Sequence, residues 1–162
     1  MGAGQRALAR RTDDWTDPSV VMFAANADPI EVMMNRARQI VLQAWQEGWT
    51  GPPYDQFRLA NYLGVDVIPS SDVFDARTVS VGSSRFQIQY EPDKPPNRVR
   101  FSIAHEIAHT LFPDCEAVRH RLQANETRYD DWQLELLCNI AAAEFLMPVG
   151  SGSSLVYENN HN

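Results

Sequence analysis

The stretch that decides the fold is RFSIAHEIAH, residues Arg100 to His109, which carries the pattern HExxH in an apolar setting. An α-helix has about 3.6 residues per turn, so His105 and His109 lie on the same face. Both imidazoles can therefore turn a ring nitrogen toward one zinc ion, while Glu106 can reach a water molecule on that ion without ligating it. The pattern predicts a Zn²⁺ peptidase site on a helix from about Asn97 to Phe112.

The composition is that of an ordinary globular protein, with 44% hydrophobic and 22% charged residues in a chain of 162. The net charge of −7 argues against direct nucleic-acid binding, because phosphate contacts need clustered lysine and arginine. No apolar run has the length needed to span a bilayer. Two cysteines, Cys115 and Cys138, are too few for a disulfide framework. We therefore expect a cytoplasmic protein with reduced thiols and no membrane partner.

Hydrophobic periodicity predicts an α+β fold in which helices come first, then a small, mainly antiparallel sheet, then two long helices. The predicted helices cover about 28–47, 57–63, 97–112 and 130–146, and the predicted strands cover 65–68, 78–81 and 85–90. Asp28 and Pro29 form a typical helix start. We expect a mobile arm over residues 1–27, one domain over 28–148, and a flexible tail or linker over 149–162.

A catalytic zinc site has three protein ligands and leaves the fourth position for water, so the two histidines need a partner. The last predicted helix offers Glu135 and Glu144, both in apolar sequence, where a carboxylate is costly unless it is paired or bound to metal. Cys138, one turn after Glu135, could also ligate, although its apolar neighbours favour a buried, inert thiol. Asn139 is a candidate hydrogen-bond partner of a ligand.

Three separated blocks of the sequence closely resemble the ImmA/IrrE-type metallopeptidases. They are residues 100–109, residues 135–148 (ELLCNIAAAEFLMP), and the lead-in between Gly51 and Val67; together the resemblance covers about 30–148. It implies a zincin-like HExxH helix followed by a helix that supplies a third ligand. This ligand would be Glu135, as in the gluzincins, whereas Glu144 would be structural, paired with an arginine such as Arg100.

The resemblance also implies a function. Members of this family typically cut a repressor and release its genes, often under stress or in phage and mobile elements. The expected partner is therefore a protein substrate, such as a helix-turn-helix repressor, and Glu106 would be the general base and acid of its hydrolysis. Two alternatives stay open: a binding module that regulates a partner without cutting it, and a toxin–antitoxin component.

Overall fold

Helices and strands follow one another in the predicted order in the structure, a computed structural model that describes residues 14–118 and 132–150. The elements are α2 (Pro18–Ala24), α3 (Pro29–Gln46), α4 (Gln56–Tyr62), β1 (Asp66–Pro69), β2 (Ala76–Gly82), β3 (Arg85–Tyr90), α5 (Pro96–His109) and α7 (Trp132–Leu146). The α+β class predicted from the sequence is confirmed. The first 13 residues, residues 119–131 and the end of the chain from 151 lie outside the described residues.

Helix α3 begins where the sequence predicts. The side chain of Asp28 accepts a hydrogen bond from the backbone N–H of Ile30 at 3.0 Å, and Pro29 occupies the first helical turn. The helix buries its apolar face, which consists of Met33, Ala37, Ile40, Val41 and Ala44.

The sequence analysis assigned residues 1–27 to a mobile arm. This expectation is wrong for residues 18–24, which form helix α2. Val20 is fully buried in the main core. The backbone before the helix is also held, because Gln133 of α7 accepts hydrogen bonds from the N–H groups of Thr16 and Asp17 at 2.9 and 2.8 Å. The same side chain donates to the carbonyl of Asp14 at 2.9 Å. A buried residue from another helix thus fixes a segment whose own sequence has little periodicity.

The sheet has three strands in the order β1-β3-β2 and is mixed. Strands β2 and β3 form the predicted antiparallel hairpin, with Thr78 opposite Ile88. Strand β1 instead runs parallel to β3, with Val67 opposite Ile88. The central strand β3 buries Ile88 completely, and β2, at the edge, turns Thr78 inward, where it is 2% exposed.

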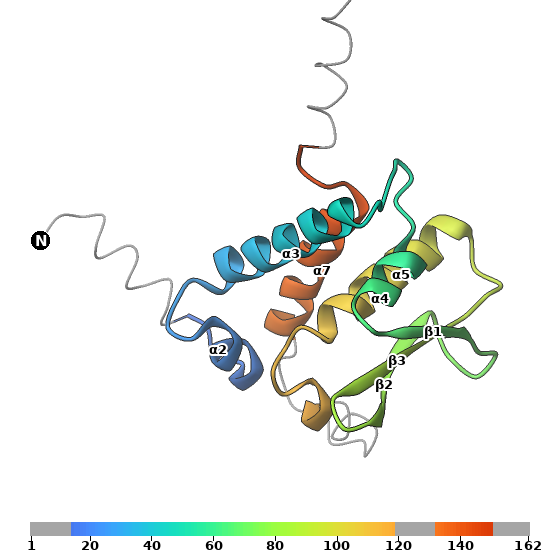
Figure 1. Cartoon of the computed structure of the whole chain (residues 1–162). Helices are drawn as coiled ribbons and strands as arrows, with labels where there is room; N and C mark the ends of the chain where they lie inside the picture. Colours follow the sequence, from blue (N-terminus) through green and yellow to red (C-terminus); the bar gives the residue numbers. More distant parts are fainter. Residues whose placement is uncertain (1–13, 119–131, 151–162) are drawn as a thin grey trace, which may run out of the picture.

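Helix α5 lies between the sheet and α7, and α3 packs on the other side of α7 (Figure 1). Fully buried residues of both helices join in one core, including Ile103, Ile107, Leu137 and Phe145. Helix α5 therefore packs against the sheet on one side and against α7 on the other. Both the sheet and α7 contribute polar groups to the site described below.

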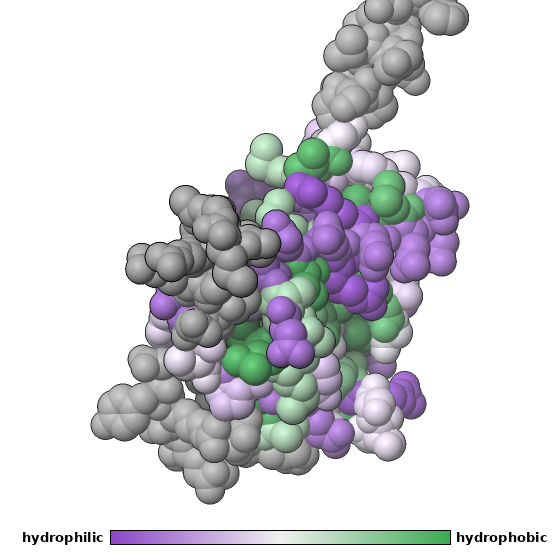
Figure 2. Space-filling view, turned by 90° about the vertical axis from the view of Figure 1, so that its left-hand side faces the viewer, coloured by the Kyte–Doolittle hydropathy of each residue, from purple (hydrophilic) through white to green (hydrophobic). Residues whose placement is uncertain are grey.

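On the face shown in Figure 2, hydrophilic residues form a broad band and hydrophobic residues gather only in separate patches. Within residues 14–118 and 132–150, no helix combines the length and the apolarity needed to cross a bilayer.

Candidate metal centre

The two motif histidines lie at the C-terminal end of α5, as the spacing predicts. The helix ends at His109, three residues before the predicted end at Phe112. Its last turn is closed by the hydroxyl of Thr110, which donates to the carbonyl of Ile107 at 2.6 Å. Side-chain bonding of this kind competes with the backbone hydrogen bond that would continue the helix.

Glu135 of α7 closes a triangle with these histidines. One carboxylate oxygen lies 2.7 Å from His105 Nε2, and the other lies 3.1 Å from His109 Nε2. The two Nε2 atoms are 3.2 Å apart. The His109 side chain is almost fully buried, that of His105 is 14% exposed, and that of Glu135 is 46% exposed. The triangle is thus anchored in the protein on the histidine side and open to solvent on the carboxylate side.

Asn139 orients the His105 ring from the opposite side. Its Oδ1 lies 2.9 Å from His105 Nδ1. A carbonyl oxygen only accepts, so Nδ1 carries a proton, and Nε2, which faces Glu135, is the nitrogen that would bind a metal after losing its own proton. The predicted contact of Asn139 with a motif histidine is present.

The charges in the cluster shift the pKa values of both partners. Burial lowers the pKa of His105, but the hydrogen bond and the negative charge of Glu135 raise it by more. Glu106 and Asn139 raise it further, so the net pKa of His105 lies above its ordinary value. For Glu135, burial raises the pKa of the carboxyl, yet the hydrogen bonds and charges of His105 and His109 hold it well below its usual range. Glu135 is therefore ionised at neutral pH, the form in which a carboxylate ligates a metal.

Glu106 faces the sheet instead of α7. It is 8% exposed, and one of its carboxylate oxygens accepts a hydrogen bond from the hydroxyl of Thr78 at 2.6 Å. Thr78 belongs to β2, 28 residues earlier in the chain. The sequence analysis missed it, because nothing in an alternating strand pattern tells which helix residue its inward threonine will meet.

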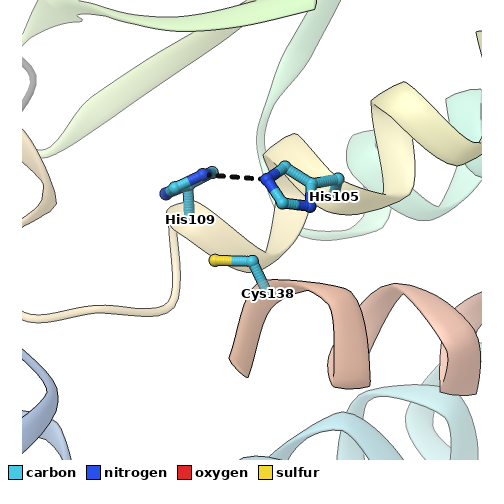
Figure 3. A group of neighbouring side chains, drawn as sticks. All are labelled: His105, His109 and Cys138. Atoms are coloured by element: carbon cyan, nitrogen blue, oxygen red, sulfur yellow. Dashed lines mark hydrogen bonds between the residues drawn. The ribbon is translucent and has the colours of Figure 1, made fainter. Parts of the chain in front are cut away.

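Cys138 lies beneath the histidines. Figure 3 shows its thiol, carried by α7, pointing toward the pair on α5. The sulfur and the histidine ring nitrogens lie within 4.8 Å of one another, so these three residues form a second possible ligand set. The residue is fully buried. No disulfide joins it to Cys115, the other cysteine, in agreement with the sequence analysis.

Glu144, the rival carboxylate, lies elsewhere on α7. One of its oxygens is 3.8 Å from Arg38 Nε of α3, and it also accepts a hydrogen bond from the backbone of Val149. The predicted structural ion pair is thus present, but the suggestion of Arg100 as its partner is wrong. Arg100 instead donates to Asn97 on its own helix.

The donor set of His105, His109 and Glu135 fits a zinc ion. Tetrahedral ligands at roughly 2.0–2.2 Å from zinc lie about 3.3–3.6 Å from each other. The three donor atoms lie 2.7, 3.1 and 3.2 Å apart, so they converge on one point and would separate slightly to admit the ion. Imidazole nitrogen with carboxylate oxygen is also a donor combination that suits zinc, and the solvent-exposed side leaves room for a water molecule.

Comparison with known proteins places the chain in a family. A family model described as the IrrE N-terminal-like domain (Peptidase_M78) matches residues 60–150, more than half of the chain. The matched region includes β1 to β3 and both helices that carry the cluster. No curated protein matches the chain. The family match agrees with the resemblance read from the three sequence blocks, and the chain belongs to the IrrE N-terminal-like family of metallopeptidases.

Proposed function

We propose that this protein is a zinc-dependent endopeptidase in which His105, His109 and Glu135 hold the metal and Glu106 is the general base. The observation that carries the proposal is the triangle of donor atoms, in which Glu135 lies within 3.1 Å of both histidines although it comes from a different helix. A carboxylate that contacts two imidazoles and lines an open cleft is placed as the third ligand of a catalytic metal would be.

When bound, zinc supplies Lewis acidity, which polarises a carbonyl and lowers the pKa of water toward 7. The protein's own residues do the rest. Asn139 keeps the proton of His105 on Nδ1, so that Nε2 offers its lone pair. Glu106 takes a proton from the attacking water and delivers it to the leaving amide nitrogen. Thr78 fixes one oxygen of that carboxylate and so helps to orient it.

Cys138 is the rival third ligand, and three observations favour Glu135. The carboxylate contacts both Nε2 atoms directly, whereas the thiol belongs to a wider group that spans 4.8 Å. Glu135 is already ionised, the form in which a carboxylate ligates a metal. Glu135 also lines the open cleft, and a metal there can meet a substrate.

A direct test is the zinc content of purified variants. Glu135→Ala should lose zinc on dialysis, because two imidazoles alone hold the metal weakly, whereas Glu144→Gln changes a carboxylate on the same helix and should keep it. Mass spectrometry of the metal distinguishes the two ligand sets. Full zinc in Glu135→Ala together with loss of zinc in Cys138→Ser would reject Glu135 and establish the cysteine as the ligand.

We further propose that the substrate is a specific regulatory protein, such as a helix-turn-helix repressor whose cleavage releases genes in a stress, phage or mobile-element response. Membership of the IrrE N-terminal-like family supports a protein substrate. The net charge of −7 gives no support to a nucleic-acid substrate. Two buried thiols with no disulfide between them are consistent with action in the cytoplasm.

The substrate proposal is tested with a candidate helix-turn-helix repressor chosen from the genes that flank this one. We expect cleavage by the zinc-loaded protein, none after treatment with a chelator, and none with Glu106→Gln. A stable complex without cleavage would instead favour the regulatory binding module. Neither cleavage nor binding would show that this repressor is not the substrate.

A further inference from the structure

A cleft of about 310 Å³ opens beside the metal centre and continues past it. One part of its lining is the cluster itself, with His105, Glu106 and Glu135. The remainder comes from the start of α5 and from the turn before β2, and it includes two phenylalanines, Phe74 and Phe101. The cleft is lined mostly by polar groups, and these two phenylalanines are the large apolar side chains in it.

Both phenylalanines are exposed, Phe74 at 81% and Phe101 at 39%. A single exposed apolar residue needs no explanation, but two in the same cleft beside a reactive cluster mark a binding surface. The ring of Phe101 has its centre 6.1 Å from that of His105. Since one extended residue spans about 3.3–3.6 Å, a side chain one or two residues from a bond at the cluster reaches this ring.

The turn that carries Phe74 is held in place by its neighbours. Asp75 has φ +60°, in the left-handed region, and Arg98 donates to both of its carboxylate oxygens at 3.2 and 2.7 Å. The backbone N–H and carbonyl of Asp75 are hydrogen-bonded to Glu91 at 3.2 and 2.8 Å. Lys94 places its ammonium group 5.0 Å from the centre of the Phe74 ring. The exposed ring is therefore presented on a fixed backbone.

The charges at this end of the cleft are already paired. Arg98 lines the cleft, but its guanidinium is bound to Asp75, and Lys94 lies 3.8 Å from Glu91. Both cations therefore already have a carboxylate partner, and the two aromatic rings are the groups of this part of the cleft that suit an apolar side chain.

We propose that Phe74 and Phe101 form a subsite for a large apolar side chain of the substrate, within two residues of the scissile bond. This inference rests on the proposed function and makes it more specific. It predicts that the cleaved segment of the partner protein carries a residue such as leucine, methionine or phenylalanine there, and that glycine or a charged residue is disfavoured.

The probes are two small zinc-binding compounds, acetyl-leucine hydroxamate and acetyl-glycine hydroxamate, titrated calorimetrically into the full, zinc-loaded chain. We expect the leucine compound to bind at least about tenfold more tightly, the low end for filling an apolar pocket. Phe74→Ser should reduce the preference to about twofold, while Phe74→Leu should keep most of it. Leu42→Ser is the matched control, because Leu42 is a 54% exposed residue of α3 outside the cleft.

The outcomes separate this inference from the proposed function. If the glycine compound binds in a zinc-dependent way but the wild type shows no preference for leucine, the subsite is refuted and the metal centre stands. A preference that survives in the double variant of Phe74→Ser and Phe101→Ser refutes it as well. If neither compound binds the zinc-loaded chain, the catalytic metal site fails and the subsite fails with it.

Discussion

Replacing Thr78 by valine tests whether strand β2 positions Glu106, the proposed general base. The substitution keeps the shape of the side chain and removes only the hydroxyl that donates to Glu106 at 2.6 Å. Thr78 is 2% exposed, so it touches no substrate and the change should leave KM and zinc content unaltered. A hydrogen bond to a charged group contributes about 1.5–3 kcal/mol. Since roughly 1.4 kcal/mol corresponds to tenfold in rate, a carboxylate freed to rotate should lower kcat by about 10- to 100-fold.

The assay is steady-state cleavage of the repressor used in the substrate test. Zinc content and thermal unfolding are measured on the same samples. Thr78→Ser restores the hydroxyl and should recover most of kcat, although it lacks a methyl group. In a Glu106→Gln background, Thr78→Val should have little further effect on the rate, because both changes act on one group. A Thr78→Val protein that folds, holds zinc and turns over at the wild-type rate would refute the positioning role.

Three further predictions concern the base, the ligand partner and the N-terminal segment. Glu106→Gln should keep its zinc and lose about 10²–10⁴-fold in kcat, and wild-type turnover would exclude Glu106 as the base. Asn139→Ala should weaken zinc binding about 10- to 100-fold in a chelator competition, because the His105 ring loses its orienting contact; unchanged affinity would deny that role. Gln133→Leu should lower the free energy of unfolding by about 1–3 kcal/mol in urea titrations, because three backbone groups near α2 lose their partner; an unaltered midpoint would show that water replaces it.

Local patterns predicted the helices and strands well where the signal is contiguous. Helix α3 has a capping residue and a regular apolar face, and the hairpin of β2 and β3 has alternation and a short turn, so both are found near their predicted positions. Helix α2 was missed although Asp17 and Pro18 form the same start signal as Asp28 and Pro29, because its run of apolar residues has no helical periodicity. The direction of β1 was also missed, since a four-residue strand pattern does not reveal which neighbour it will join.

The site was predictable in part for the same reason. The two histidines lie on one helix, so their proximity follows from the helical repeat. The contact of Glu135 with them depends on how α7 packs against α5, and residue patterns alone left Glu135, Glu144 and Cys138 open. Resemblance to a family favoured Glu135, and the structure brings that carboxylate to the histidines while pairing Glu144 with Arg38.

The HExxH spacing itself explains why residues of this site are contacted by both α7 and β2. Successive residues of a helix are turned by about 100°, so Glu106 lies to one side of the line that joins His105 and His109. In this fold the histidine face meets α7, which supplies Glu135 and Asn139, and the glutamate face meets β2, which supplies Thr78. The proposed metal ligands and the proposed base are therefore contacted by different elements of the fold. It follows that Glu135→Ala on α7 should remove zinc together with the rate, whereas Thr78→Val on β2 should lower the rate alone. If Thr78→Val lost as much zinc as Glu135→Ala, the contributions of β2 and α7 would not be independent.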